Sequence, residues 1–467
     1  MERLTAQDLS SIWPEEFGWP QDIGALAILD GDELLDQNGR FRIEHVRDWI
    51  GRRVYLVPRF RQILYMPRKG LGWPLWVDAP SFDVAQHVGV QAVDSPGGER
   101  QLLAACERLR RRTLDRSRPL WEAWFLPGLP DRRIGLFMKL HHAVADGVAG
   151  VAAFGALLDF TPDALPPASP PWTPAPIPSA RELFADNWRR RTDALDGFLS
   201  SVGHPMEAVR RAKRLWPWVR ENLGNGAPRT SINRRVGRDR RLAVVRSRLD
   251  LVKEAAHAHG GKVNDVLLAA LAGGLRDLLR SRGEPTDGLA LRVFVPVSLH
   301  QEQPGGARGN LDGAMVVPVP VGEPDPVRRL WTIAAETAER KRNTPPAAGT
   351  LFRNGVVQRS FLRMLPYQRI MNVYATNVPG PPVPMYLAGA RVLEVFPIVP
   401  IMGNDTIGVG ALSYDGQFNL TVVADRDACP DIEVLVDGTR SSLAALARAV
   451  SVDDHELIAT APGVPTG

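Results

Sequence analysis

The sequence predicts an α/β or α+β protein with two domains of similar size. Strand-like apolar runs alternate with amphipathic helical runs in both halves of the 467 residues, a pattern typical of mixed folds. Between the halves lies a connector at residues 161–178 (TPDALPPASPPWTPAPIP). Because proline has no backbone donor, the connector should be extended and exposed. We expect an N-terminal domain over residues 1–160, a proline-rich linker with a helical connector over 161–240, and a C-terminal domain over 241–467.

Two strands and one helix are predicted before the connector. Residues 23–29 and 134–141 (IGLFMKLH) are apolar runs of strand length. Residues 101–114 are expected to form an amphipathic helix, because apolar side chains recur along one stripe. This stripe consists of Leu102, Leu103, Cys106 and Leu109.

A helical and basic region follows the prolines. Residues 180–223 are rich in Arg and Trp and are expected to form one or two helices, and residues 229–248 are strongly basic. Trp188, Trp216 and Trp218 stand close to arginines in this region. A helix of this kind either packs against the protein or rests on a membrane or lipid droplet, and both interpretations are open.

The strongest helix prediction in the C-terminal half covers residues 264–282. Asn264 is a suitable N-cap, and Gly283 occupies the position of a C′ glycine. Strands are predicted at residues 289–297 and 315–321. A hairpin is predicted across Asp415-Gly416, a dipeptide typical of type I′ turns, with strands at 406–414 and 417–423.

Charge and cysteine content argue against several classes of protein. Lys and Arg number 57 against 52 Asp and Glu, a net charge of +5, which is too small for an obligate nucleic-acid binder. It fits a small polyanionic ligand or an anionic membrane surface. Cys106 and Cys429 cannot build a disulfide framework or a zinc site. With neither a signal peptide nor a run of 18 apolar residues in view, we expect a cytoplasmic protein.

The chemistry is expected at residues 139–147 (KLHHAVADG). His141 and His142 end a predicted strand, and Asp146 and Gly147 follow. A shared metal ion is disfavoured, because neighbouring side chains on a strand point to opposite faces. Buried, hydrogen-bonded histidines with Asp146 as a helix cap are one alternative. The other is general-base catalysis, in which one histidine faces a cavity, Asp146 fixes the turn and Gly147 permits the bend.

The His-His-x-x-x-Asp-Gly pattern resembles the motif of the CoA-dependent acyltransferase superfamily. This superfamily includes chloramphenicol acetyltransferase, peptide-synthetase condensation domains and the bacterial wax ester synthase/diacylglycerol acyltransferases. Other segments resemble the last group in the same order, and the similarity spans residues 4–427. They are Pro119-Leu120-Trp121, Asn264-Asp265, residues 295–299 (VPVSL), Gly309-Asn310 and residues 376–381 (TNVPGP), which include Asn377.

Three departures from this family accompany the resemblance. Where the family often has Met-His before the first strand, this chain has Gln21-Asp22. His300 stands where the family commonly has Arg, and residues 304–308 lengthen the loop that follows. These changes bear on substrate preference and on catalytic rate rather than on the fold.

The resemblance implies a chloramphenicol-acetyltransferase-like fold with an active-site tunnel between its domains. It also implies acyl transfer from acyl-CoA, as substrate and without a cofactor, to diacylglycerol or a long-chain alcohol. His142 would be the general base. Alternatives are a different acceptor, such as a polyketide alcohol or an amine, or a non-catalytic lipid-binding homologue. Contact with a membrane or lipid inclusion would be peripheral.

The resemblance also suggests roles for the remaining motif residues. Pro119, Leu120 and Trp121 would pack in the core or line the tunnel. Asn264 and Asp265 would cap a helix, or shape the acyl or CoA channel through its free amides. Asn377 would form part of the wall that faces His142. The basic residues 229–248 would meet CoA phosphates or remain solvated.

The resemblance implies that Asp146 is structural and pairs with an arginine, for which Arg292 is the candidate and Arg61 the alternative. A buried arginine needs an acid, and Arg292 is a charge within an apolar strand. Asp146→Asn should therefore lower the melting temperature and the acyl-transfer rate together. Thermal melting and an activity assay on the same preparation test this. Full loss of activity with unchanged melting would contradict the assignment.

Overall fold

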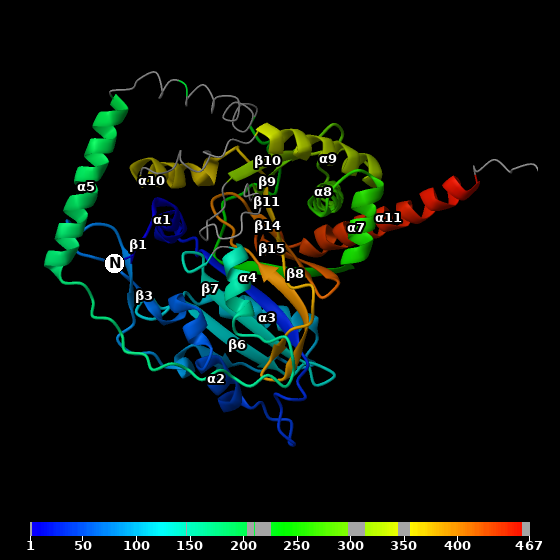
Figure 1. Cartoon of the computed structure of the whole chain (residues 1–467). Helices are drawn as coiled ribbons and strands as arrows, with labels where there is room; N and C mark the ends of the chain where they lie inside the picture. The colour runs from blue at the N-terminus through cyan, green and yellow to red at the C-terminus, as the bar shows by residue number, and fades with distance from the viewer. Residues whose placement is uncertain are drawn as a thin grey trace, which may run out of the picture.

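The described part of the chain contains two six-stranded sheets, a small three-stranded sheet and the helices around them. The computed structural model describes residues 2–145, 147–202, 210, 226–297, 313–343 and 355–459. Figure 1 shows the two sheets side by side, with helices α7, α8, α9 and α11 gathered around the second sheet. The mixed α/β architecture with two domains is thus as predicted.

The first sheet has the strand order β12-β13-β2-β7-β6-β5. Its bounds are β12 Tyr386–Leu387, β13 Ala390–Ile398, β2 Asp22–Leu29, β7 Ile134–His141, β6 Trp121–Pro127 and β5 Val88–Val90. β7 lies between β2 and β6, and all of its residues are buried. This central position explains why β7 is a nearly continuous apolar run, as predicted for residues 134–141.

The second sheet has the order β10-β9-β11-β14-β15-β8. Its bounds are β10 Gly313–Val319, β9 Leu291–Val297, β11 Val373–Pro379, β14 Ile407–Tyr414, β15 Gln417–Asp425 and β8 Arg240–Arg248. β14 and β15 form the predicted hairpin, and Asp415 and Gly416 have φ values of 44° and 76°. Both positive values fit the type I′ turn that this dipeptide favours.

One segment of the C-terminal half belongs to the first sheet. β13 pairs antiparallel with β2, and β12 pairs with β13. Residues 386–398 therefore leave the predicted C-terminal domain (241–467) and complete the sheet of the N-terminal one. Local periodicity carries no information about which sheet a strand joins, so the sequence did not reveal this crossover.

Ten helices are named in the described part of the chain, and one of them carries the apolar stripe predicted from the sequence. The helices of the first half are α1 Ala6–Ile12, α2 Ile43–Gly51, α3 Glu99–Arg111, α4 Gly147–Gly155 and α5 Ala180–Val202. In the second half they are α7 Leu249–Ala258, α8 Val263–Ser281, α9 Pro326–Asn343, α10 Gly355–Met364 and α11 Ile432–Ala459. The predicted stripe of α3 is buried. Within the described residues, no helix combines the length and apolar character needed to cross a bilayer.

Helix α8 begins one residue earlier than predicted, and its cap differs. The N-cap is Lys262 rather than Asn264, which lies in the first turn. The Asp265 carboxylate accepts the backbone N–H of Lys262 at 2.8 Å and so replaces an N-cap side chain. Gly283 does have the left-handed conformation expected after the helix.

Close packing of α8 on α11 depends on a glycine. A Cβ at Gly274 would lie 2.3 Å from the Leu435 carbonyl oxygen, so any other residue would push the helices apart. The apolar core on this side of the sheet also includes residues of β9, β11, β14 and β15, while Thr439 of α11 is buried at the contact itself. The second sheet is thereby held against α8 and α11.

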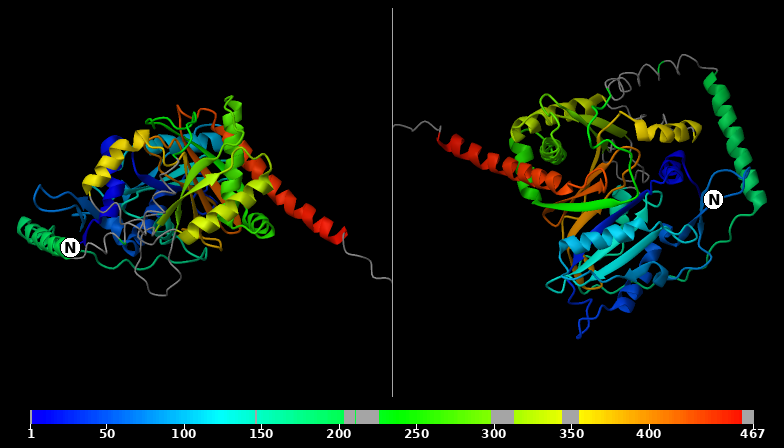
Figure 2. Two further views of the ribbon diagram at one scale, coloured as in Figure 1. Left: turned by 90° about the horizontal axis from the view of Figure 1, so that it is seen from above. Right: turned by 180° about the vertical axis from the view of Figure 1, so that it is seen from behind.

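Residues 164–179 contain no helix or strand, in agreement with the predicted proline-rich connector. The helix that follows the connector packs on a small sheet. This sheet consists of β1 Glu2–Arg3, β4 Leu75–Asp78 and β3 Gln62–Tyr65. Figure 2 shows this helix, α5, at the outer edge of the molecule in both views. Trp216 and Trp218, predicted to lie on a helix, are outside the described residues, as are His300 and residues 304–308.

A tyrosine joins the crossover segment to the second sheet. The Tyr414 hydroxyl donates to the Val392 carbonyl at 2.9 Å and accepts the Met385 N–H at 2.8 Å, and the side chain is buried. Tyr414→Phe leaves both backbone groups unpaired. We expect a loss of about 1–3 kcal/mol in the free energy of unfolding.

Denaturant unfolding of the Tyr414→Phe variant measures this loss. Tyr367→Phe is the matched control, because this tyrosine is 82% exposed and its replacement should change the free energy by less than about 0.5 kcal/mol. Equal stability of the two variants would show that the hydroxyl does not secure the crossover.

Candidate functional site

The two histidines follow from the way β7 ends. His141 is the last residue of β7 and lies opposite Asp22 of β2. The chain then leaves the sheet, and the backbone N–H of His142 donates to the Gln21 carbonyl at 2.9 Å. Helix α4 starts at Gly147, four residues after Ala143. The motif therefore occupies the turn between a central strand and a helix.

His141 is buried, and both of its ring nitrogens are engaged. The Ala143 N–H donates to Nδ1 at 3.0 Å, so Nδ1 carries no proton and acts as the acceptor. Nε2 lies 3.0 Å from Glu15 Oε1 and must therefore be the donor. With 2% of its side chain exposed, His141 is held as a structural group that supports the turn.

Glu15 links His141 to the surface. One carboxylate oxygen accepts from His141, and the other accepts from Arg116 at 2.5 Å. Burial alone raises the pKa of Glu15, but the hydrogen bond from His141 and the electrostatic attraction to it, followed by those of Arg116, outweigh burial and lower the pKa to about 2. Glu15 was not predicted from the sequence, because a glutamate near the N-terminus carries no periodic or spacing signal.

A buried ion pair lies on the same sheet face. Lys139 Nζ is 3.2 Å from Asp22 Oδ2, and the two side chains are 1% and 4% exposed. Lys139 also donates to the Arg112 carbonyl. Burial raises the pKa of Asp22, and the charge of Lys139 opposes this rise in part. Asp22 is one of the departures from the family pattern, and its pairing with Lys139 was not predicted. The signal that could have revealed the pair is the lysine itself, because a charge within an apolar strand needs a partner.

His142 differs from His141 in its surroundings. It is half-buried, and its Nδ1 lies 3.5 Å from the Ser11 hydroxyl oxygen of α1. The next residues, Ala143 and Val144, pack into an apolar cluster that also contains Tyr374 of β11. The two histidines therefore face different environments, as expected for adjacent residues at a strand end.

The predicted partners of Asp146 are placed only in part. Asp146 lies outside the described residues, so its pairing with Arg292 stays a prediction. Arg292 is 9% exposed on β9. Its neighbours Val293 and Val295 pack in the core with α8, so Arg292 lies on the opposite face of the sheet. Arg61, the alternative, stacks over Trp172 of the connector at 4.7 Å.

The Pro119-Leu120-Trp121 segment, at the start of β6, packs next to the histidine turn. Trp121 is fully buried, donates its indole N–H to the Phe60 carbonyl at 3.0 Å and stacks on the Phe60 ring. The Leu120 carbonyl accepts the His141 N–H at 3.0 Å, and Pro119 is buried beside it. Core packing, one of the two predicted roles, describes these contacts.

The remaining predicted residues lie on the second domain. The buried Asp265 accepts from Thr337 of α9 at 2.7 Å, besides capping α8, and its contacts are therefore structural. Asn264 is half-buried beside it. Asn377 is half-buried on β11, the strand that α4 contacts. Asn377 has the strand parity of Val373 and Ala375, which pack with α8. Its side chain therefore lies on the α8 face of the sheet, opposite the face of Tyr374 that packs with Ala143 and Val144, and is not brought to His142 as predicted.

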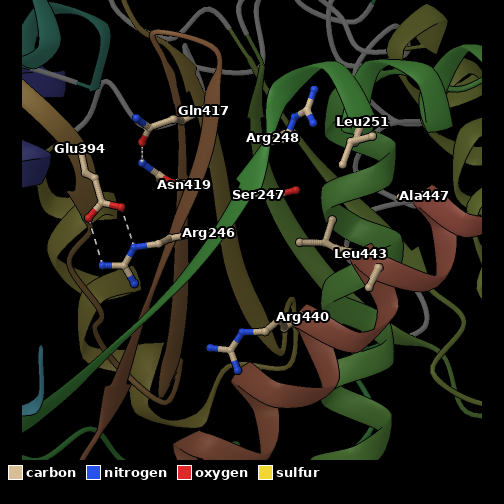
Figure 3. A pocket seen from close by; sticks show the side chains of 11 residues that line it. Arg246, Ser247, Arg248, Leu251, Glu394, Gln417, Asn419, Arg440, Leu443 and Ala447 are labelled. Carbon is tan, nitrogen blue, oxygen red and sulfur yellow. Dashed lines mark hydrogen bonds and ion pairs between the residues drawn. The ribbon is translucent and has the colours of Figure 1, made fainter.

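A separate groove of about 440 Å³ lies between β8, β15 and helices α7 and α11. Figure 3 shows Arg246, Arg248 and Arg440 around it. Each pairs with a carboxylate, namely Glu394, Asp250 and Asp437 respectively. Arg246 and Arg248 belong to the basic stretch 229–248, which was predicted to meet CoA phosphates or to remain solvated. Because both are paired with carboxylates, a phosphate bound here would have to compete with these acids.

The lowered pKa of Glu15 predicts a pH-dependent contribution to stability. Because the folded-state pKa is about 2 and the ordinary value 4.5, the ionised carboxylate stabilises the fold above pH 4.5. This contribution is lost as the pH falls from 4.5 towards 2. We expect Glu15→Gln to lower the free energy of unfolding by about 2 kcal/mol at neutral pH, with a difference that narrows in acid.

Unfolding curves at several pH values test this expectation. Glu16→Gln is the control, because the neighbouring Glu16 forms an exposed ion pair with Arg359 that should contribute less than about 1 kcal/mol. A stability difference for Glu15→Gln that does not change between neutral and acidic pH would refute the assignment.

Comparisons with known proteins agree with the motif. The sequence model of the wax ester synthase/diacylglycerol acyltransferase catalytic domain matches residues 4–267, and that of the WS/DGAT C-terminal domain matches residues 308–447. A putative diacylglycerol O-acyltransferase of Mycobacterium tuberculosis is 33% identical over 430 residues, 86% of this chain and 89% of the relative. A probable diacylglycerol O-acyltransferase of the same organism is 31% identical over 452 residues, 91% and 90% of the two chains.

Solved structures show the same fold. The wax ester synthase/diacylglycerol acyltransferase from Marinobacter aquaeolei superposes with a TM-score of 0.71 at 24% identity, over 97% of this chain and all of that one. The starter condensation domain of rhizomide synthetase, in complex with C8-CoA and Leu-SNAC, gives 0.57 at 14% identity over 96% and 94% of the chains. With its catalytic-domain match over more than half of its length, this chain belongs to the wax ester synthase/diacylglycerol acyltransferase family and is an acyltransferase.

Proposed function

We propose that the protein transfers a long-chain acyl group from acyl-CoA to the hydroxyl of diacylglycerol or a long-chain alcohol, with His142 as general base. The observation that carries the proposal is the contrast between the two histidines. Both ring nitrogens of His141 are engaged with Ala143 and Glu15. His142 is half-buried in the turn that follows. It is therefore the histidine suited to exchange a proton with a substrate.

The reaction needs one proton relay. With Nδ1 oriented towards Ser11, Nε2 of His142 takes the proton of the acceptor hydroxyl while the oxygen attacks the thioester carbonyl. The tetrahedral intermediate then collapses and the C–S bond breaks. The CoA thiolate takes the proton back from His142 and leaves as the free thiol, so that the imidazole returns to its starting state.

The transfer is direct from thioester to alcohol. The sequence contains no Gly-x-Ser-x-Gly segment that would provide a serine nucleophile. A positioned base supplies a factor of about 10²–10⁴, and binding both substrates together supplies much of the remainder. The names of the related proteins support diacylglycerol as acceptor. Since such acceptors reside in lipid assemblies, we propose peripheral contact with a membrane.

His142→Ala tests the assignment directly. With palmitoyl-CoA and either dioleoylglycerol or hexadecanol, we expect its turnover to fall by about 10²–10⁴-fold, as measured by ester formation and by thiol release. The exposed His257 of α7 provides the control, because His257→Ala should retain full activity.

The same assay separates the alternatives. Ester formation with one of the two lipid alcohols identifies the acceptor. Retained turnover in His142→Ala would overturn the general-base role. An inert wild-type protein that still binds lipid would favour the non-catalytic homologue over an enzyme of this specificity.

A further inference from the structure

Aromatic and apolar side chains are exposed together where α5 meets the β3–β4 hairpin. Phe184 and Trp188 of α5 are 55% and 61% exposed, and their rings stack with centroids 6.3 Å apart. Met66 and Trp73 of the hairpin are 56% and 45% exposed. We call these four side chains the α5 patch. Burying such groups from water is favourable, so their exposure needs an explanation.

Polar and apolar contacts between α5 and the β1–β4–β3 sheet hold the α5 patch in place. The buried Arg3 guanidinium pairs with Asp186 at 2.5 Å and donates to the Leu183 carbonyl at 2.9 Å. Asn187 donates to the Gly70 carbonyl at 2.8 Å. Leu183 is fully buried against the hairpin. The helix is therefore docked through one face, and the opposite face is presented outward.

The outward face of α5 combines aromatics with cations. Arg181, Phe184, Trp188 and Arg191 follow one another at helical spacing, so they share this face. Arg68 and Lys69 at the tip of the hairpin and Arg189 are also exposed. Basic residues thus outnumber the nearby acids, of which Asp186 already pairs with Arg3 and Arg190.

We propose that the α5 patch is a docking surface for an anionic phospholipid bilayer. Tryptophan and phenylalanine favour the headgroup boundary, and flanking arginines and lysines attract anionic lipid. The proposal rests on the proposed function in one respect: the bilayer is the source of the lipid acceptor. Its residues are separate from those of the histidine motif.

A second copy of the chain is a poorer occupant for this surface. In a twofold dimer the same patch would face itself. The exposed cations of one copy, Arg181 and Arg191 among them, would then approach those of the other, which disfavours pairing. A negatively charged membrane complements this surface instead.

Flotation of the full chain with lipid vesicles tests the proposal. We expect the protein to float with phosphatidylcholine vesicles that contain phosphatidylglycerol, and at least tenfold less with phosphatidylcholine alone. Phe184→Ser/Trp188→Ser should lower binding to the anionic vesicles by tenfold or more. Arg181→Gln/Arg191→Gln should lower it by about fivefold per cation, and added salt should reduce the difference.

Trp331→Ser is the matched control. Trp331 is 53% exposed on α9, which lies on the other side of the molecule from α5 (Figure 1). This variant should bind vesicles like the wild type. All of these variants should retain wild-type turnover of a short-chain acyl-CoA with a water-soluble alcohol, because the α5 patch is not part of the histidine motif.

The possible outcomes separate this proposal from the proposed function. Equal flotation of Phe184→Ser/Trp188→Ser and wild type overturns the docking surface while acyl transfer stands. A wild-type dimer that this variant converts to monomer, without vesicle binding, also overturns it and assigns the patch to a subunit interface. Patch-dependent flotation of a protein without transferase activity supports the surface and refutes only the acyl-transfer proposal.

Discussion

The hydrogen bond between His141 and Glu15 is the interaction on which the candidate site depends. β7 is buried along its whole length, so every polar group at its end needs a partner inside the protein. Glu15 provides one for His141, and Asp22 provides one for Lys139. These partners come from segments distant in sequence. The N-terminal residues are therefore part of the structure of the candidate site rather than a peripheral addition to it.

Much of this fold could be predicted from local sequence. β7 matches its predicted range, and the Asp415-Gly416 hairpin follows from turn chemistry. The N-cap of α8 was wrong by two residues, because the side chain of Asp265 reaches back to Lys262. The β13 crossover was not predicted at all. Hydrophobic periodicity indicates whether a strand is buried. Which strand it pairs with depends on contacts between residues far apart in the chain.

In the candidate site, too, some residues could be predicted from local sequence and others could not. The residues of the motif, His141 and His142, are adjacent in sequence and could be identified from their spacing. Glu15 and Ser11 could not, because they approach the histidines through the fold of α1 and the turn after it. Sequence alone did not decide which histidine is structural. In the structure, the Ala143 N–H and Glu15 engage both ring nitrogens of His141, and this contrast supports the role proposed for His142.

The β13 crossover has a consequence for how the chain is made. Until residues 390–398 have been synthesised, β2 lacks its outer neighbour and remains an unpaired edge, the kind of surface that recruits other strands. The first sheet must therefore wait for most of the polypeptide to leave the ribosome. A chain that ended at the proline-rich connector would lack β13 and expose the edge of β2. We expect such a fragment to be prone to aggregation and to depend on chaperones.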